Sequence, residues 1–304
     1  MDPIEILQLC KQGANEGAPG DLLVPGFFSA GDYELLWKRE QKTVRRLLDD
    51  IVCGEYASDG LDLLLKAGVL SALLPELVTI KSMGTANGSH KDVWEHSKQV
   101  MLGVPATPEM RWSALFHDIG KATTRRIDAK GHVTFHCHEL VGAKMVDRIQ
   151  TRLRFFGDDT SMFRNVRLLV QYHLRPASFK ESSTDHAVRR FIVDCDESGD
   201  RGFMNKLITL SRADITTKSG AKRAKAKARA DMLEEKIKEV IAERDAPKLP
   251  KGTMGSILEL SGRKPGGWLN ELREGLESGL RDGSIALGLT MDEYATIGLE
   301  RIKP

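Results

Sequence analysis

Apolar residues recur at helical spacing along nearly the whole of this 304-residue chain, and that pattern limits the fold more than any other feature. From Asp32, a favoured helix-capping residue, apolar positions follow one helix face: Leu35, Leu36, Val44, Leu47, Leu48 and Ile51. Further helices are expected at 59–68, 70–77, 91–104, from Pro108 into His117, and at 139–155, 158–174, 185–195, 201–218 and 220–243. One segment departs from the pattern, a hairpin at 125–136 that turns at Lys130-Gly131. The predicted class is all-α, a helical bundle with one small hairpin and a small helical C-terminal tail.

Glycine and proline divide the chain into four expected parts. They crowd 13–31 and predict an irregular N-terminal lead-in over 1–31. A helical, neck-like region follows at 32–90, and the main helical domain at 91–246. Pro247 and Pro250 end the long charged helix, and 247–304 is expected to form three short helices.

The composition limits the cellular compartment and the kinds of partner that the chain is expected to have. The formal net charge is +2, so any nucleic-acid partner requires a local patch. The four cysteines, Cys10, Cys53, Cys137 and Cys195, form no CxxC pair and suit reduced thiols. The N-terminus lacks the order of a signal peptide, and no apolar run approaches the roughly 20 residues that span a bilayer. A soluble cytoplasmic protein without a membrane partner is expected.

Histidines and aspartates recur at similar points of successive predicted helices. Inward-facing ligands on neighbouring helices are how helical bundles build metal sites. Imidazole and carboxylate together suit one or two divalent ions of Mn, Fe, Co, Ni or Zn, and Mg²⁺ is a further candidate. The predicted ligands are His96, His117, Asp118, His138, His173 and Asp214.

The segment after His117 suggests phosphoester chemistry. The Asp118 carboxylate can bridge two ions, and Lys121, three residues later, can neutralise a phosphoryl oxygen. Asp118 and Lys121 are the catalytic candidates. Arg125 and Arg175 follow the metal motifs and are the candidates for binding the substrate phosphate.

The remaining histidines carry less weight, because a single histidine at a helix end is usually a cap or a surface residue. His136 is either a partner of a ligand or a hairpin residue. His90, His132 and His186 are expected to be exposed and without a role.

The pattern His96, His117-Asp118, Asp214 resembles that of the HD-domain metal-dependent phosphohydrolases. Over about 32–300, the chain also resembles the body and tail of bacterial CCA-adding tRNA nucleotidyltransferases that carry an HD domain. The segments that carry this second resemblance are 60–77, 91–97, 111–125, 131–143, 169–176, 187–192, 211–219 and 264–279.

The resemblance implies an HD fold and specific ligands. It assigns a primary metal to His96, His117, Asp118 and Asp214, and a second to His138 and His173. It implies phosphatase, 2′-nucleotidase or 2′,3′-cyclic phosphodiesterase activity on a nucleotide or another phosphorylated small molecule.

The family's nucleotidyltransferase head has no counterpart before residue 90. The one Gly-Ser pair there, Gly88-Ser89, lacks the Asp-x-Asp that should follow it. Hydrolysis is therefore expected, and nucleotide addition is not. A non-catalytic RNA- or tRNA-binding module and the body subunit of a split nucleotidyltransferase are the alternatives.

A basic stretch, Lys218 to Arg229, follows Asp214 and contains no acidic residue. It suits contact with an RNA backbone, or steering of an anionic substrate. It also suits a solvated helix face, and the sequence favours this reading, because alanines supply helix propensity and no aromatic residue interleaves the charges.

Overall fold

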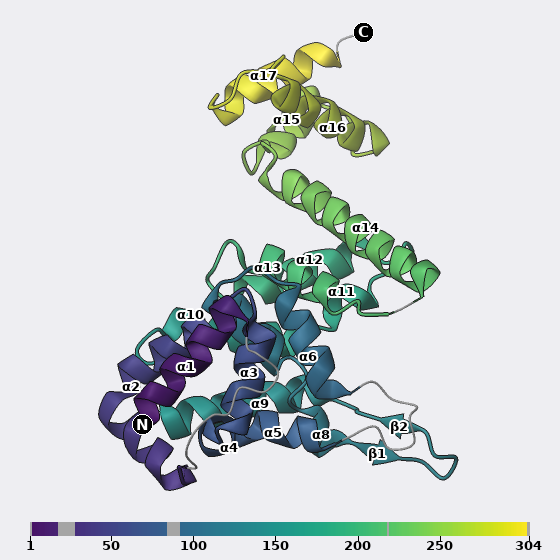
Figure 1. The fold of residues 1–304 in the computed structure, drawn as a ribbon. Coiled ribbons are helices and arrows are strands. Elements are labelled where there is room, and N and C mark those ends of the chain that lie inside the picture. Colours follow the sequence, from purple (N-terminus) through teal and green to yellow (C-terminus); the bar gives the residue numbers. More distant parts are fainter. Residues whose placement is uncertain (1, 18–27, 84–91, 218, 303–304) are drawn as a thin grey trace. The chain divides into compact units, whose positions relative to one another are not determined.

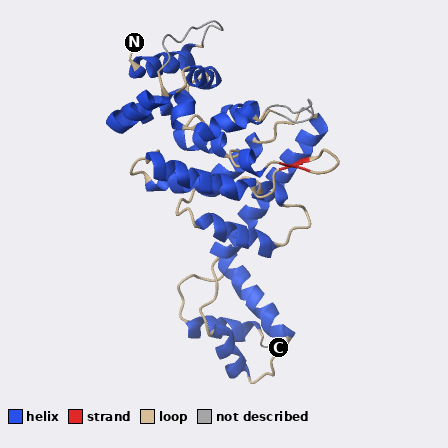
Figure 2. Cartoon of the chain, turned by 90° about the horizontal axis from the view of Figure 1, so that it is seen from below, coloured by secondary structure: helices blue, strands red, loops and turns tan. Residues whose placement is uncertain are grey.

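The computed structural model describes residues 2–17, 28–83, 92–217 and 219–302. Helices make up almost all of the regular structure in these ranges, with one two-stranded hairpin, which confirms the predicted class (Figures 1 and 2). The chain divides into two compact units, Met1–Ile237 and Lys238–Pro304. The division falls inside one continuous helix, α14 (Gly220–Asp245), and not at 247 as predicted.

The N-terminal segment corrects the sequence prediction. Residues expected to be irregular form α1 (Pro3–Glu16), because Asp2 accepts hydrogen bonds from two backbone N–H groups and Glu5 bonds back to the Asp2 N–H. Apolar residues of α1 are fully buried against α2 (Ala30–Cys53) and α3 (Ala57–Lys66). Ser29, not Asp32, caps α2, and Asp32 returns the bond. Residues 18–27 of the predicted lead-in lie outside the described residues.

The next elements lead to the predicted ligands. The helix expected at 70–77 is two helices, because Pro75 begins a new one. The hairpin is confirmed, with Arg126 opposite Thr134 and Gly131 at φ +82° in the turn. The elements are α4 (Val69–Leu73), α5 (Pro75–Ser82), α6 (Val93–Leu102), α7 (Pro108–Phe116), α8 (Lys121–Thr124), β1 (Arg126–Ile127) and β2 (Val133–Thr134).

Five further helices complete the first unit: α9 (His138–Leu153), α10 (Thr160–Tyr172), α11 (Arg175–Ser178), α12 (Asp185–Asp196) and α13 (Phe203–Ala213). An aromatic cluster joins α2 to this bundle. Trp37 stacks on Phe155 at 5.8 Å between ring centroids and donates to the Leu153 carbonyl. The Arg45 guanidinium lies 4.4 Å from the centroid of the same Phe155 ring. Trp112 of α7 meets the same Phe155 ring edge to face at 4.9 Å between centroids, so the helix that leads into the His-Asp pair packs against this cluster.

The second unit contains the three short helices predicted for the tail, α15 (Thr253–Ser261), α16 (Gly267–Asp282) and α17 (Met291–Arg301). Ile257, Leu276 and Tyr294 form part of its own small core. Among the described residues, no helix is long and apolar enough to cross a membrane.

The close packing of α1 on α3 yields a stability prediction. A Cβ atom at Gly60 would lie 2.6 Å from the Ala14 Cβ and 2.8 Å from the Ile51 Cγ2. Gly60→Ala should therefore lower the free energy of unfolding of the first unit by about 1–3 kcal/mol, despite the better helix propensity of alanine. Urea titration measures it. Gly220→Ala, where a Cβ meets no atom within 4 Å, is the matched control and should not destabilise. Equal stability of the two variants would contradict the packing of α1.

Candidate metal centre

Three histidines are oriented by the same local device. His117 directly follows α7, His173 directly follows α10, and His138 is the first residue of α9. Each ring places Nδ1 against the backbone carbonyl three residues earlier, at 2.7 Å for His117 and 2.8 Å for His138 and His173. A carbonyl only accepts, so Nδ1 carries the proton and donates it. Nε2 of each ring is the nitrogen that faces Asp118, and it carries a lone pair whenever the ring is neutral.

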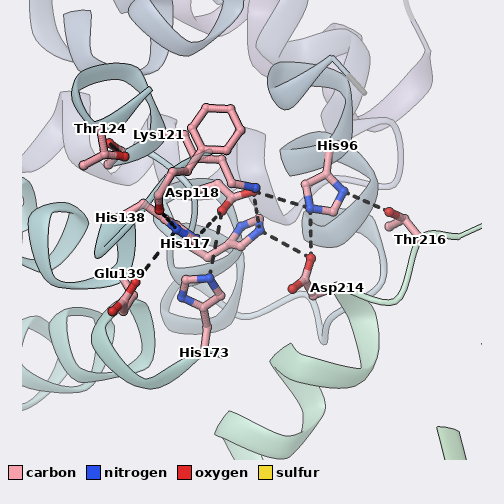
Figure 3. Close-up of polar contacts among 12 residues, drawn as sticks. His96, His117, Asp118, Lys121, Thr124, His138, Glu139, His173, Asp214 and Thr216 are labelled. Carbon is pink, nitrogen blue, oxygen red and sulfur yellow. Dashed lines mark hydrogen bonds and ion pairs between the residues drawn. The ribbon is translucent and has the colours of Figure 1, made fainter. Parts of the chain in front are cut away.

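The fourth histidine, His96, projects from the middle of α6 and is held from another direction. Its Nδ1 lies 3.0 Å from the Thr216 hydroxyl oxygen, and its Nε2 lies 2.9 Å from Oδ1 of Asp214, the residue that ends α13. Residues 214–216 thus supply both a carboxylate and the group that orients His96 (Figure 3). A partner that orients a histidine in this way is common around metal-binding imidazoles.

Asp118 lies at the centre of these side chains (Figure 3). Its Oδ2 lies 3.2 Å from His117 Nε2 and 3.5 Å from His96 Nε2. Its Oδ1 lies 3.2 Å from His138 Nε2 and 3.9 Å from His173 Nε2. The two oxygens of one carboxylate thus face two different pairs of imidazoles, as a bridging ligand would.

Potential ligand atoms form two groups, and within each group all of them lie within 4.8 Å of one another. One group is His96, His117 and Asp214, and the other is Asp118, His138 and His173. The Nε2 atoms of His117, His138 and His173 are buried and have no hydrogen-bond partner among the described residues. Buried polar atoms without partners are costly, and divalent ions satisfy convergent imidazole and carboxylate donors. The residues therefore fit a site for one or two divalent metal ions.

The charge states of the site residues follow from burial and from the two carboxylates. Burial opposes the charged form of His117, but the Asp118 and Asp214 carboxylates outweigh it and raise the pKa of His117 to about 10. The same attraction overcomes burial at Asp118 and Asp214 and holds the pKa of each well below its ordinary value. Burial, reinforced by the charge on His117, lowers the pKa of His173 to about 4. A proton on His117 thus occupies the place in which a metal ion would balance the carboxylates.

Glycines allow the two halves of the site to approach. A Cβ atom at Gly120 would lie 2.1 Å from the His138 carbonyl oxygen and 2.7 Å from the Gly142 nitrogen. The chain after Asp118 therefore packs directly on the backbone of the first turn of α9. Cys137, at φ +58°, turns the chain into that helix. These two features bring His138 to Asp118.

The structure brings all six predicted ligands together. Of the catalytic candidates, Lys121 lies beside Asp118, with Nζ 2.5 Å from Oδ2, and 5.6 Å from the centroid of the Phe135 ring. Its side chain is 21% exposed against 2% for Asp118, so an anion that enters the site can reach it.

The two predicted substrate-binding arginines do not contact the six ligands. The half-buried Arg125 guanidinium makes no hydrogen bond or ion pair with any described residue. Arg175 bonds to Asp194 at 2.5 Å and packs over the rings of Tyr172 and Phe191. Arg175 also lines a cavity of about 690 Å³ together with Glu139, whose carboxylate lies 3.8 Å from Nδ1 of His138.

His132, His136 and His186 are exposed, and the His132 ring bonds to Asp128. His136 thus lies outside the metal site as a residue of the hairpin end. His90 lies outside the described residues. The carbonyl oxygens of Ala114, Phe135 and Val170 were not predicted from the sequence, because backbone acceptors are the same for every residue type. Thr216 was not predicted either, because its partner His96 lies 120 positions away along the chain.

The packing at Gly120 yields a prediction for the metal centre. Gly120→Ala should weaken metal binding by about tenfold or more, because the added methyl group must displace the backbone that carries His138. Titration of the metal-free protein against a competing chelator measures the affinity. Gly131→Ala, in the hairpin turn with no atom within 4 Å of the new Cβ, is the control for altering a glycine near the site. Unchanged affinity in Gly120→Ala would show that the approach of α9 is not required.

Metal affinity should also depend on pH. The ordinary pKa of a histidine is 6.5 and that of His117 is about 10, so below pH 10 the metal must displace a proton from His117. Affinity should therefore rise about tenfold per pH unit between about pH 7 and 9 for one displaced proton. Chelator competition across this range tests it, with release of protons as the second readout. A flat profile would contradict a protonated His117 in the metal-free protein.

Comparison with known proteins agrees with the geometry. Residues 93–218 match the model of the HD domain. The chain is 28% identical to the A-adding tRNA nucleotidyltransferase of Deinococcus radiodurans over 256 residues, an alignment that covers 82% of the chain and 55% of that enzyme. It is 30% identical to the CC-adding tRNA nucleotidyltransferase of Thermus thermophilus over 196 residues, an alignment that covers 62% of the chain and 42% of that enzyme.

A third relative is the multifunctional CCA protein of Teredinibacter turnerae, 26% identical over 187 residues, or 57% of the chain and 43% of that protein. The chain spans about half the length of the curated relatives it matches. The resemblance predicted from the sequence motifs is confirmed: the chain carries an HD domain and is similar to the CCA-adding tRNA nucleotidyltransferases across it.

Proposed function

We propose that the chain is a metal-dependent phosphohydrolase acting on phosphoesters of nucleotides or RNA ends. The activity would be of the phosphatase, 2′-nucleotidase or 2′,3′-cyclic phosphodiesterase type. One observation carries the proposal: three buried Nε2 atoms without hydrogen-bond partners converge on both oxygens of the Asp118 carboxylate. The HD domain at 93–218 supports the same class, because HD domains are generally metal-dependent hydrolases.

His96, His117 and Asp214 would hold one ion, and His138 and His173 a second, with Asp118 between them. Nitrogen and oxygen donors of this kind suit Mn, Fe, Co, Ni or Zn better than Mg. Bound there, a divalent ion lowers the pKa of a water molecule and polarises a phosphoryl oxygen.

The protein side chains would prepare the site for an anionic substrate. His117, Asp118 and His173 are almost fully buried, so these three ligands lie in a region from which bulk water is excluded, whereas Asp214 is 27% exposed. Lys121 is the cation at the more exposed side of Asp118 and would bind a phosphoryl oxygen as charge develops on it. Arg125 is free to turn toward the substrate, whereas Arg175 is already engaged by Asp194. Arg125 is therefore the stronger phosphate-binding candidate.

The test is hydrolysis by the purified chain loaded with Mn, Ni or Co. Substrates are generic phosphomonoesters, 2′-nucleotides and 2′,3′-cyclic nucleotides, and the number of bound ions is measured in parallel. Asp118→Asn should lower kcat by about a hundredfold or more, because it removes one negative charge from the ligand that faces all four imidazoles. Lys121→Met should lower kcat as well, and Lys121→Arg should restore part of it.

His132→Ala is the matched control, because this exposed histidine bonds to Asp128 and not to the site. It should leave both metal content and kcat unchanged. A metal-loaded protein that turns over none of these phosphoesters would rule out the proposal, as would activity that survives Asp118→Asn.

A second candidate function is RNA or tRNA binding without catalysis, or a role as the body portion of a tRNA nucleotidyltransferase. Similarity to the A-adding enzyme over 82% of the chain favours it. It predicts salt-sensitive tRNA binding that survives Asp118→Ala, in a chain that hydrolyses no phosphoester. The hydrolysis assay and a tRNA-binding titration on the same preparation separate the two functions.

A further inference from the structure

The first half of α14 presents a positive surface that the metal centre does not use. Ten residues, from Gly220 to Arg229, include five basic residues and no acidic one. All five are exposed: Lys222, Arg223, Lys225, Lys227 and Arg229. Arg223 donates to the Thr217 carbonyl, but the other four make no ion pair with any described residue. Lys218, the remaining member of the basic stretch, lies outside the described residues.

The next turns of the same helix differ in the sign and the pairing of their charges. There, acidic and basic residues are mixed, and several of them are paired with other helices. Asp231 and Glu234 bond to Arg212 at 2.6 and 2.7 Å, and Lys236 pairs with Asp185 at 3.1 Å. In the first half, Lys225 and Arg229 lie four residues apart with like charges, an arrangement that destabilises a helix. An unpaired, self-repelling set of charges suits an anionic ligand better than solvent.

Lys222, Lys225 and Arg229 share one face of α14, because a spacing of three and then four residues returns to the same side of a helix. Lys225 and Arg229 line a cavity of about 460 Å³, and Lys180, from the loop before α12, lines it as well. Glu181 is the only acidic residue among the lining residues. At 1.5 Å rise per residue, the three helical positions span about 10 Å, a length over which successive phosphates of one strand can be contacted.

A short stretch of chain connects this surface to the metal centre. The Thr217 carbonyl, which Arg223 binds at 2.9 Å, lies three residues after Asp214. Three extended residues reach at most about 11 Å. Thr216, between them, contacts His96 at 3.0 Å. The positive surface therefore begins beside the segment that supplies a predicted metal ligand.

We propose that Lys180, Lys222, Lys225 and Arg229, here called the α14 basic face, bind the phosphodiester backbone of a polynucleotide. We also infer that an end of this polynucleotide reaches the metal centre, and this second part rests on the proposed function. It makes the substrate a nucleic acid chain and not a free mononucleotide, because a mononucleotide lacks the successive phosphates that three aligned cations can contact.

The test is binding of a labelled single-stranded RNA of about 12 nucleotides, with hydroxyl groups at both ends, over a range of salt concentrations. The triple variant Lys222→Ala/Lys225→Ala/Arg229→Ala should lower the slope of log Kd against log salt by about 2, since each phosphate contact contributes about 0.7. At about 0.1 M salt the same three contacts correspond to a roughly hundredfold rise in Kd. Alanine retains helix propensity and removes the repulsion, so Tm should not fall.

Two control variants sharpen the result. Lys222→Arg/Lys225→Arg/Arg229→Lys keeps the charges and should keep the salt slope. Lys38→Ala/Arg39→Ala/Lys42→Ala removes three exposed basic residues from α2 and should leave the RNA affinity near that of the unmodified chain. The inference is overturned if the α14 triple variant binds RNA as the unmodified chain does, or if the α2 variant loses as much affinity.

The same titration with DNA of the same sequence identifies the source of the backbone. A loss confined to RNA assigns the face to RNA, and an equal loss with both assigns it to the phosphodiester chain of either. Binding is measured without turnover. A chain that hydrolyses no phosphoester but loses salt slope in the triple variant would end the proposed hydrolase function and keep this inference. Hydrolysis with an unchanged slope would do the reverse.

Discussion

The site depends on one repeated interaction, the hydrogen bond from Nδ1 of a histidine to the carbonyl three residues earlier. His117, His138 and His173 all make it, although each enters from a different helix terminus. It fixes the tautomer and the ring orientation and leaves Nε2 directed at Asp118. A buried carboxylate surrounded by such nitrogens is unfavourable without a positive charge. The Asp118 and Asp214 carboxylates overcome burial and raise the pKa of His117, so that a proton on this ring supplies the charge, whereas burial, reinforced by that charge, lowers the pKa of His173.

The helix ends of the first unit place the histidines where they can make this hydrogen bond. Helices α7 and α10 deliver a histidine with the residue after their last turn, where unpaired carbonyls accept the ring N–H. Gly120 and Cys137, whose φ is positive, bring the start of α9 against the residues that follow Asp118. Asp214 is a predicted metal ligand, Thr216 orients His96, and the Thr217 carbonyl accepts from Arg223 of α14, so neighbouring residues contact both the candidate metal centre and the helix that carries the basic face.

Much of this was accessible from sequence. Helical periodicity predicted the class and most helices, because burial of an apolar face leaves a spacing that survives in the residue order. The hairpin and the three tail helices were predicted for the same reason. The prediction of an irregular N-terminal lead-in was wrong. It relied on the glycine and proline content, whereas the capping box of Asp2 and Glu5 begins a helix in this segment. The boundary of the second unit was also misplaced, because Pro247 ends α14 while the packing changes eight residues before that helix ends.

By itself, the sequence determined the all-α class and the six side chains able to bind a metal, because ligand chemistry is a property of residue type. Only the tertiary structure decided how they are used. It divided the potential ligands into two groups, turned the two oxygens of Asp118 toward different imidazole pairs, tied Arg175 to Asp194 and left Lys222, Lys225 and Arg229 without an ion pair among the described residues. These outcomes depend on contacts between residues up to 120 positions apart, such as Thr216 and His96, and on backbone carbonyls, which are the same for every residue type.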